Sequence, residues 1–507
     1  MLLTNYIPTK SNCNFSFYFS LNKHSYLLDM KVTCLNQMNN FFDVINREES
    51  FPKLYVYNFH YFDFLNNPRS PQKDNLEAIY IWINDYEYQN KLGGDAYPTS
   101  LRIVNWIKWA TKQTNLQPIF YNSLYNQSKL LYANIEYEID GNHLFANGKA
   151  LIFYGIYFDG DWAEKCLNKG LKIIINELDR QVLKDGGNFE LSPMYHGIML
   201  EDLLDLYILA LPNNFNYENI IHLLKPYIEK MIDWLKIIII DKVTYPHFND
   251  STQNVAPSPK NLFDISISLG FNNASYDGSF LLAQTGYCVL KSKAFSLLCD
   301  VANVGPDYIP GHAHADTLSY ELWANGKKLI CNLGISEYGT GPRRLYERGT
   351  SSHSTVEING KNSTNVWSGF RVAERARILN QNFNIENNIL NATHNGYKNV
   401  LHSRQWILCD DELEIIDIIK SKKNVSFKLF HHLTPNVYCE KINDHLFKIN
   451  DGISDYTFEL VGLEQTRFEK NQYAIAFNVL EDTTTIVGSG CSLNEEHVFK
   501  SILRKIT

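Results

Sequence analysis

The sequence lacks paired cysteines. It has nine cysteines, and no two of them stand in a C-x-x-C arrangement. Disulfide scaffolds and cysteine zinc ribbons need closely spaced, even-numbered cysteines, so this pattern excludes both. A chain of 507 residues does not need such staples, because at roughly 100–200 residues per domain it can bury the cores of two to four domains.

Long apolar runs are missing as well. A membrane-spanning helix needs about 20 consecutive apolar residues, whereas runs such as Leu206 to Leu211 are far shorter. No positively charged start followed by an apolar stretch marks a secretory signal near the first residue. We therefore expect a cytoplasmic protein as the sequence stands, or a periplasmic or secreted one if a signal has been removed.

The sequence also has no excess of positive charge. With 47 Lys and Arg against 55 Asp and Glu, its net charge is −8, which provides no overall field to attract nucleic acid or membranes. We expect no nucleic-acid partner, and a polyanionic ligand would need a local basic cleft. Aromatic residues are plentiful, with 31 Tyr and 29 Phe; they suit a large core and also surfaces that stack on sugars.

Two patterns divide the rest of the sequence near 251–275. Up to that point, apolar residues recur at helical spacing in segments such as 101–110, and short loops join these segments. Helices joined in this way form antiparallel hairpins, as in a toroid or solenoid. Beyond it, short β-type runs alternate with turns such as Asn325-Gly326, which is typical of a β-sandwich. In the first fifty residues we expect a strand and a helix, at 15–20 and 30–47.

The segment from Gly311 to Asp316 carries the strongest chemical pattern. In an extended strand, side chains two residues apart point the same way, so we expect His312, His314 and Asp316 to share one face. Two imidazoles and a carboxylate are unfavourable to bury without partners. They suit a metal site, a proton-transfer site, or both. The alternative is a hydrogen-bonded strand with surface histidines.

Two shorter motifs lie in the helical part. Asn142 has the right residue type to cap a helix that includes His143, and a helix N-terminus is favourable for an anion. Tyr195 and His196 stand where a loop leads into an apolar helix. A tyrosine there can act as an acid or a base if its neighbours adjust its pKa. The first motif can equally be an ordinary capped helix, and a Tyr-His pair by itself is more often structural.

A third motif lies between Tyr338 and His353. Arginine side chains fork onto carboxylate and sulfate groups. We therefore predict that this segment binds acidic groups of a substrate, although its charges can equally be solvated. The candidate substrate-binding residues are Arg343, Arg344, Tyr346 and Arg348, together with His196 from the preceding motif.

With these motifs in order, the chain resembles the heparinase II/III-type polysaccharide lyases. The matching pieces are Tyr57–Asp63, Tyr97–Trp106, Asn142-His143, Ser192–His196, His312–Asp316 and His353–Val356. The first two are similar to those of a subset associated with bacterial polysaccharide gene clusters. The resemblance implies a multidomain α+β protein with an N-terminal incomplete α/α toroid followed by an antiparallel β-sandwich. Its implied parts are an N-terminal extension (1–50), the toroid (51–265) and the sandwich (266–507).

The resemblance also implies roles for single residues. Asn142 and His143 resemble the pair that engages a uronate carboxylate, Tyr195 the catalytic tyrosine, and His312 the catalytic histidine. Two further histidines resemble ligands of the zinc ion found in some members, whose third ligand is usually Asp. This chain has a neutral amide there, which binds zinc more weakly than a carboxylate does. The metal-ligand set implied by the resemblance is His314, His353 and Asn332.

The implied reaction is β-elimination on a uronic-acid-containing acidic polysaccharide. Tyr195 or His312 would take the C5 proton, and Tyr195 would protonate the departing O4. Hydrogen bonds from Asn142 and His143 would stabilise the charge that develops on the carboxylate. Two other hypotheses stay open: a zinc-dependent hydrolase, because His-x-His also opens amidohydrolase metal sites, and a non-catalytic polysaccharide-binding or assembly protein on the same scaffold.

Overall fold

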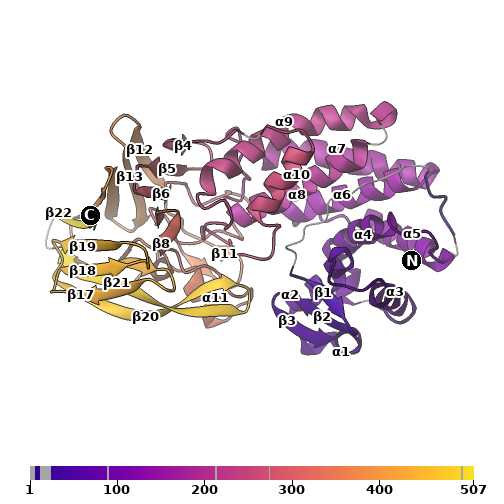
Figure 1. Cartoon of the computed structure of the whole chain (residues 1–507), viewed down its shortest axis with the longest axis horizontal. Coiled ribbons are helices and arrows are strands. Elements are labelled where there is room, and N and C mark those ends of the chain that lie inside the picture. Colours follow the sequence, from indigo (N-terminus) through magenta and orange to yellow (C-terminus); the bar gives the residue numbers. More distant parts are fainter. Residues whose placement is uncertain are drawn as a thin grey trace. The chain divides into compact units, whose positions relative to one another are not determined.

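The computed structural model of the protein describes residues 6–11, 24–87, 89, 91–211, 214–272, 274–492 and 495–506, except for the side chains of 214–216. Its internal contacts divide the chain into two units, which can be followed in Figure 1 by their position in the sequence. Unit 1 comprises Met1–Val182, Gly197–Ile232 and Asn254–Asn272, and unit 2 comprises Leu183–His196, Asp233–Gln253 and Asn273–Thr507.

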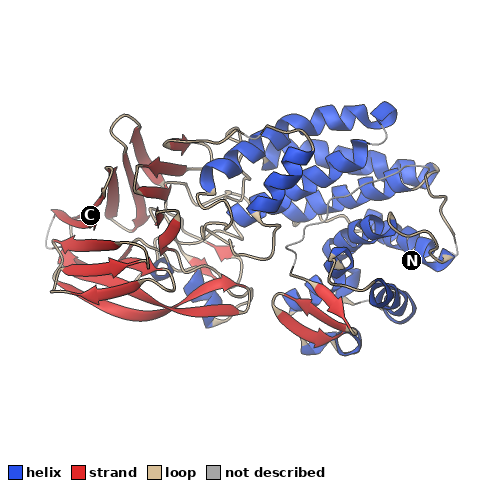
Figure 2. Ribbon diagram, viewed as in Figure 1, coloured by secondary structure: helices blue, strands red, loops and turns tan. Residues whose placement is uncertain are grey.

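Unit 1 is built mainly from helices, which are blue in Figure 2. Two of the helices below pass from one unit into the other: α8 begins in unit 2 and α9 ends there. Among the described residues, none of the helices has both the length and the apolar character needed to cross a bilayer. The helices in this part of the chain are α1 (Phe41–Asn46), α2 (Lys53–Tyr61), α3 (Gln72–Ile81), α4 (Ala96–Ala110), α5 (Pro118–Ala133), α6 (Gly141–Tyr157), α7 (Asp161–Gln181), α8 (Pro193–Ala210), α9 (Asn214–Ile238) and α10 (Pro259–Ser268).

The packing of α6 on α7 shows how the sequence pattern produces this arrangement. Helix α6 is buried along most of its length, whereas α7 buries one stripe that includes Ile173, Ile174 and Leu178. Where the two helices meet, a Cβ atom on Gly170 would lie 2.7 Å from the carbonyl oxygen of Gly148. Glycine at this point therefore allows the two backbones to approach closely.

The first fifty residues differ from the prediction. The strand expected at 15–20 lies outside the described residues. The helix expected at 30–47 is wrong, because a three-stranded antiparallel sheet occupies most of this segment and only α1 is helical. Leu35 and Asn36 both have positive φ (50° and 62°), which is the geometry of a tight hairpin turn. The strands are β1 (Tyr26–Leu28), β2 (Lys31–Cys34) and β3 (Gln37–Asn40).

Unit 2 contains two large antiparallel sheets, which are red in Figure 2. The nine-stranded sheet has the order β20-β21-β16-β8-β7-β6-β5-β4, with β9 paired to β16. Its strands are β4 (Phe280–Leu282), β5 (Tyr287–Lys291), β6 (Phe295–Asp300), β7 (Tyr320–Ala324), β8 (Lys327–Cys331), β9 (Val356–Ile358), β16 (Val425–Leu433), β20 (Gln465–Ala476) and β21 (Val479–Ser492). The eight-stranded sheet has the order β12-β13-β14-β15-β22-β19-β18-β17. Its strands are β12 (Ile378–Asn384), β13 (Ile389–Tyr397), β14 (Val400–Leu408), β15 (Glu412–Ser421), β17 (Tyr438–Lys441), β18 (Leu446–Asn450), β19 (Asp455–Val461) and β22 (Glu495–Lys505).

The two sheets share one apolar core. Residues alternate between buried and half-buried along β14 and β15, which is the period-two pattern of a strand with one face inside. Trp406 from one sheet and Leu322 from the other belong to the same buried cluster. Asn325 and Gly326 form the predicted two-residue turn between β7 and β8, both with positive φ. The predicted order, a helical region followed by an antiparallel sandwich, is confirmed; the domain limits at 50 and 265 stay predictions.

Shorter elements and loops of unit 2 carry the chemical motifs. The short elements are the hairpin strands β10 (Val366–Trp367) and β11 (Arg371–Val372) and the helix α11 (Pro342–Glu347). The strand predicted for 311–316 is wrong, because these residues form part of the loop between β6 and β7. Their side chains bond to distant segments instead of lining one face of a ladder, as described below. A turn with Ala313 N–H donating to the carbonyl of Pro310 interrupts the extended backbone.

Candidate functional site

His312 is held by Tyr195 in the first turn of α8 and by Glu190, which precedes this helix. Its ring stacks on the ring of Tyr195, with centroids 3.9 Å apart and planes 15° apart. Its Nδ1 hydrogen bonds to the carboxylate of Glu190, a side chain that is 3% exposed. Because an ionised carboxylate only accepts hydrogen bonds, His312 donates from Nδ1, and this leaves Nε2 without a proton in the neutral ring.

Tyr195 occupies the first turn of α8, and the local sequence explains why. The hydroxyl of Ser192 accepts a hydrogen bond from the Tyr195 backbone N–H (3.2 Å) and donates one to the carbonyl of Asp250 (2.6 Å). A serine followed by proline is a favourable way to begin a helix. The phenol hydroxyl lies 3.1 Å from that of Tyr338. Burial raises the pKa of Tyr195 well above its ordinary value, and nearby Tyr338 and Asp250 raise it further.

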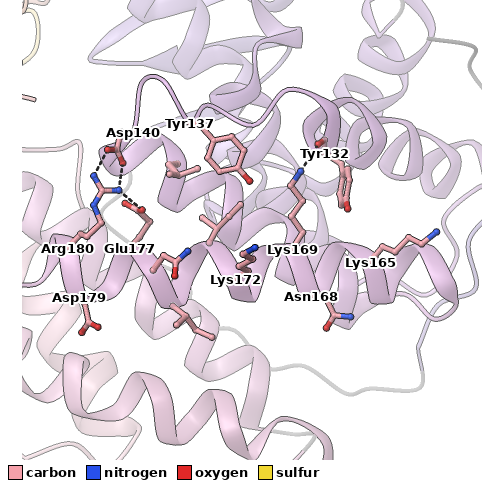
Figure 3. Close-up of a pocket in the computed structure, with 14 residues that line it drawn as sticks. Tyr132, Tyr137, Asp140, Lys165, Asn168, Lys169, Lys172, Glu177, Asp179 and Arg180 are labelled. Atoms are coloured by element: carbon pink, nitrogen blue, oxygen red, sulfur yellow. Dashed lines mark hydrogen bonds and ion pairs between the residues drawn. The ribbon is translucent and has the colours of Figure 1, made fainter. Parts of the chain in front are cut away.

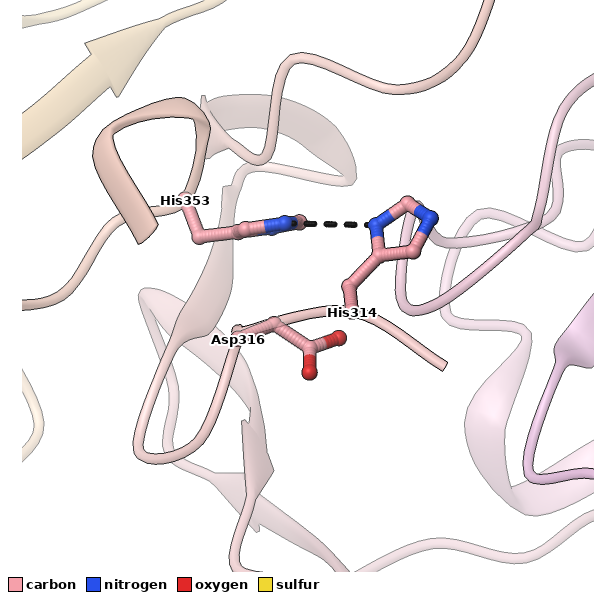
Figure 4. Close-up of side chains that lie close together, drawn as sticks. All are labelled: His314, Asp316 and His353. Carbon is pink, nitrogen blue, oxygen red and sulfur yellow. Dashed lines mark hydrogen bonds between the residues drawn. The ribbon is translucent and has the colours of Figure 1, made fainter. Parts of the chain in front are cut away.

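A second cluster contains His314 and Asp316, which follow His312 closely in the sequence, and the more distant His353. One ligand atom from each of these buried residues lies within 4.8 Å of the others. Figure 4 shows the two imidazoles facing each other, with Nδ1 of His314 3.3 Å from Nε2 of His353. The other nitrogen of His314 is 2.8 Å from Oδ1 of Asp250. That carboxylate fixes the His314 tautomer, so that Nδ1 presents a lone pair to the cluster.

Asp250 is a charged centre inside unit 2. Burial would raise the pKa of its carboxyl, but Arg344 and His314 outweigh burial and hold that pKa well below its ordinary value. Arg344 donates to both carboxylate oxygens, at 2.5 and 2.6 Å. Burial also lowers the pKa of His314 to about 4, even with the opposing effect of Asp250. The His314 ring is therefore neutral near pH 7, which is the form that binds metals.

The donor set in this cluster fits a zinc ion. Two imidazole nitrogens and a carboxylate are typical zinc ligands. Asn332, the third ligand that the family resemblance implies, has two internal hydrogen bonds: Oδ1 accepts from the Ser354 backbone N–H (3.0 Å), and Nδ2 donates to Ser319 (3.3 Å). The carboxylate in this cluster belongs to Asp316. The amide at 332 therefore does not deprive the cluster of an anionic ligand.

The arginines lie elsewhere than the sequence suggested. Arg344 and Arg348 are 0% exposed. Arg348 donates to the backbone carbonyls of Ala313, Ser368 and Gly369, and Arg344 also donates to the carbonyl of Gly369. Because both guanidinium groups are buried and bonded internally, we assign them to the framework of the site and not to substrate binding.

The other predicted substrate-binding residues have internal partners too. His196 is 0% exposed; its ring stacks on Trp234, with centroids 4.3 Å apart, and its Nδ1 accepts from the Asn188 N–H. Arg343 is half-buried and donates to Glu347 (2.6 Å) and to Gln472 (3.2 Å). The hydroxyl of Tyr346 hydrogen bonds to the side-chain amide of Asn471. Of these residues, His196 is too deeply buried in the structure to meet a ligand.

In unit 1, Asn142 and His143 lie in the first turn of α6. The predicted N-cap, Asn142, is wrong by two residues, because Asp140 occupies that position and accepts from the Gly141 N–H. The ring of His143 stacks on Tyr97, with centroids 4.1 Å apart, and Nδ2 of Asn142 is 3.4 Å from the Tyr97 hydroxyl. Tyr97 therefore orders both side chains.

The start of α6 is also anchored to α7. Arg180 joins the carboxylates of Asp140 and Glu177, as Figure 3 shows at one end of a groove of about 1100 Å³. Burial would raise the pKa of Asp140, but the Arg180 guanidinium outweighs it and lowers that pKa. Gln181 donates to the carbonyl of Gly141 (2.9 Å). Two residues of the α7 end, Arg180 and Gln181, thus hold the first turn of α6, which carries Asn142.

The structure adds residues that the sequence analysis did not single out. Glu190 lies only five residues before Tyr195, and this closeness to the Tyr195 motif was the available signal. Tyr97 also belongs to a quoted motif. Tyr338 begins the third motif, where it was given no role; its partner is Tyr195. Asp250 had no comparable local signal, because its importance comes from side chains that are distant in the sequence, such as His314.

Two family profiles together match most of the chain. The family profile described as heparinase II/III N-terminus matches residues 34–269, and the profile described as heparinase II/III-like, C-terminal, matches residues 277–500. A heparin-sulfate lyase from Bacteroides stercoris is 25% identical over 338 residues, which is 61% of this chain and 48% of that protein. A heparin-sulfate lyase from Pedobacter heparinus is 24% identical over 319 residues, 59% of this chain and 46% of that protein. The chain thus spans about half the length of these curated relatives.

A solved structure shows the same fold. The crystal structure of heparinase III aligns with a TM-score of 0.72 and 16% sequence identity, covering 90% of this chain and 78% of that chain. At this identity the likeness concerns the fold alone. It confirms the predicted architecture, an N-terminal α/α toroid followed by a C-terminal β-sandwich.

Proposed function

The chain belongs to the heparinase II/III-like family, and on this premise we propose that it is a polysaccharide lyase. Its substrate is a uronic-acid-containing acidic polysaccharide, cleaved by β-elimination to leave a 4,5-unsaturated uronate end. The observation that supports this most directly is the stacked pair of Tyr195 and His312, with Glu190 on the far nitrogen of the imidazole. The heparin-sulfate lyases among the relatives agree with a polysaccharide substrate.

In the proposed mechanism, His312 is the base. The C5 proton of a uronate is weakly acidic, because removing it places a second negative charge beside the carboxylate. Glu190 accepts the Nδ1–H of His312, so Nε2 carries the lone pair that takes this proton. The family resemblance assigns the hydrogen bonds that stabilise this charge on the carboxylate to Asn142 and His143.

Tyr195 is the acid in the same mechanism. Its raised pKa keeps the phenol protonated near neutral pH, so it has a proton to give to the departing O4. The electron pair of the broken C5–H bond forms the C4–C5 double bond, and the C4–O4 bond breaks. One proton leaves the substrate and one reaches the leaving group, with no water consumed.

We also propose that His314, Asp316 and His353 hold one zinc ion with a structural role. When bound, zinc supplies a fixed point that joins the His312 loop to the segment around His353. The expected result is about one zinc per chain by metal analysis, lost in the double variant His314→Ala/His353→Ala. A chelator should lower the melting temperature of the wild type, and it should have no such effect on the double variant. The exposed His445→Ala is the matched control; equal zinc content in all three proteins would refute the assignment.

Incubation with a panel of defined acidic glycans tests the lyase proposal. A lyase generates ultraviolet absorbance from the new double bond, which is conjugated with the carboxylate. New reducing ends without absorbance would instead support the zinc-hydrolase hypothesis. Binding without either product would support a non-catalytic binding or assembly protein.

A further inference from the structure

The β10–β11 hairpin presents two exposed aromatic side chains. Trp367 is 53% exposed and Phe370 is 43% exposed. Single exposed aromatics are common on soluble proteins and carry no conclusion by themselves. Here the position matters, because the ring of Phe370 lies 6.0 Å from that of His312 and 5.0 Å from that of Tyr338, edge-on in both cases. Phe370 therefore borders the proposed base and still has much of its surface open.

The tip of this hairpin is fixed by the two buried arginines. Arg344 donates to the carbonyl of Gly369 (3.1 Å), and Arg348 donates to the carbonyls of Ser368 and Gly369 (both 3.1 Å). Burying a guanidinium group is unfavourable unless its donors are satisfied. A Cβ atom on Gly369 would lie 2.4 Å from the carbonyl oxygen of Gly339, so the tip packs tightly on the preceding loop.

Through these contacts, the two arginines connect the hairpin to the residues around His312. The guanidinium carbon of Arg344 also lies 5.4 Å from the centroid of the Phe370 ring and 4.8 Å from that of Tyr338. Arg348 joins the hairpin to the carbonyl of Ala313, one residue after His312. The hairpin and the proposed base are therefore parts of one rigid assembly, which is the preorganisation that a binding surface needs.

The chemistry of the hairpin suits an acidic sugar. One face of a pyranose ring presents C–H groups, which pack on aromatic rings, while its substituents are polar or charged. Arg371 is exposed and pairs in register with Trp367 across the two strands, so an aromatic surface and a cation lie next to each other. Tyr308 gives a further exposed aromatic side chain on the loop that leads to His312.

We propose that the β10–β11 hairpin is a saccharide-binding subsite beside His312, where Phe370 and Trp367 pack against a sugar ring and Arg371 binds its acidic group. This inference rests on the proposed lyase function and extends it to a neighbouring residue of the polymer. The hairpin residues act on binding and position, whereas the proton transfers belong to His312 and Tyr195.

The test compares Phe370→Ala and Trp367→Ala with wild type, using the full chain and acidic oligosaccharides of increasing length. Each variant should raise KM roughly tenfold on the longer substrates, the loss expected when an aromatic contact is truncated, while kcat changes much less. Phe370→Tyr should restore most of the affinity. Tyr438→Ala, which removes an exposed aromatic on β17, is the matched control and should leave KM unchanged.

Arg371→Gln tests the acidic group separately. This variant should bind acidic oligosaccharides more weakly and carboxyl-reduced ones as well as wild type does. If the wild type forms no unsaturated product, the lyase proposal fails, and the same variants are then compared by direct binding to the acidic polymer. Equal KM or equal binding for Phe370→Ala, Trp367→Ala and wild type at every length would overturn the subsite.

Discussion

At the scale of single residues, Tyr195 and His312 have different partners, and the proposed mechanism therefore gives them different roles. Burial keeps the phenol protonated, whereas Glu190 holds the imidazole with Nε2 available. The sequence alone left either residue as the base. The difference follows from their partners, since one side chain lies against a second tyrosine and the other against a carboxylate.

Tyr195→Phe should abolish turnover and leave substrate binding nearly intact. The substitution removes the hydroxyl that protonates O4 in the proposed mechanism, but it keeps the ring that stacks on His312. The ultraviolet assay measures turnover, and titration with a polymer measures binding. Tyr227→Phe removes a surface hydroxyl that bonds to Asp179 and should behave as wild type. Unchanged turnover in Tyr195→Phe would remove this residue from the mechanism.

Glu190→Ala should lower kcat by about 10²–10⁴, the usual range for a general base, with a small change in KM. Without the carboxylate, neither the tautomer nor the ring orientation of His312 is fixed. Steady-state kinetics on the preferred glycan gives both constants. The exposed Glu440→Ala on β17 serves as the control. A higher KM with an unchanged kcat would indicate that Glu190 contacts the substrate and does not orient His312.

At the scale of elements, a buried polar network on β14 and β15 supports the site. Arg404 donates to Asp417 through two nitrogens (2.7 and 3.0 Å) and to the carbonyls of Leu318 and Ser354 (2.8 and 3.0 Å). These two carbonyls follow Asp316 and His353 closely in the sequence. The eight-stranded sheet thus holds both loops of the candidate metal cluster.

Arg404→Met should lower the free energy of unfolding by about 3–5 kcal/mol, because it leaves Asp417 buried without its cation. Burial would raise the pKa of Asp417, but Arg404 and His402 outweigh it and lower that pKa to about 2. This stabilisation is complete above the ordinary pKa of 3.8 and is lost as the pH falls towards 2. Urea unfolding at neutral pH measures the loss. Arg504→Met, which breaks an exposed pair with Glu412, should cost about 0–1 kcal/mol; equal effects would contradict the network.

Glu87, which follows α3 in unit 1, should make stability fall with rising pH. Burial raises the pKa of Glu87 from 4.5 to about 7. As the pH rises, the unfolded chain therefore loses this proton at a lower pH than the folded chain does. The folded state therefore loses stability between about pH 4.5 and pH 7. Glu87→Gln should unfold at higher temperature than wild type at pH 8 and at a similar temperature at pH 4.5. Thermal scans at the two pH values decide this, with the exposed Glu77→Gln as control; a constant difference would contradict the burial of a charge.

At the scale of the whole molecule, the net charge of −8 opposes a polyanionic substrate. At about 0.01 M salt the screening length is about 30 Å, so the repulsion acts over much of the protein; at about 0.1 M it falls to about 10 Å. KM for the polymer should therefore be lower at the higher of these salt concentrations. Initial rates measured across this range give the answer. A KM that rises steadily with salt would show that a local basic cleft dominates over the net charge.

The sequence by itself determined the local features. Helical periodicity and turns such as Asn325-Gly326 predicted that a helical region precedes a β-sandwich. Both signals depend only on residues that are close in the sequence. The order of the motifs identified the family. The prediction of a helix at 30–47 was wrong. Leu35 and Asn36 have positive φ and form a hairpin turn, which the pattern of apolar residues did not reveal.

Only the tertiary structure decided which side chains meet. Glu190 and His312 are 122 positions apart, and Arg344 and Asp250 are 94 apart. No local spacing indicates such pairs, because the packing of whole segments brings them together. That packing brought the carboxylate of Asp316 close to the imidazoles of His314 and His353. The same packing buries Arg344 and Arg348, which we had expected to bind substrate. Their hydrogen bonds connect the loops around His312.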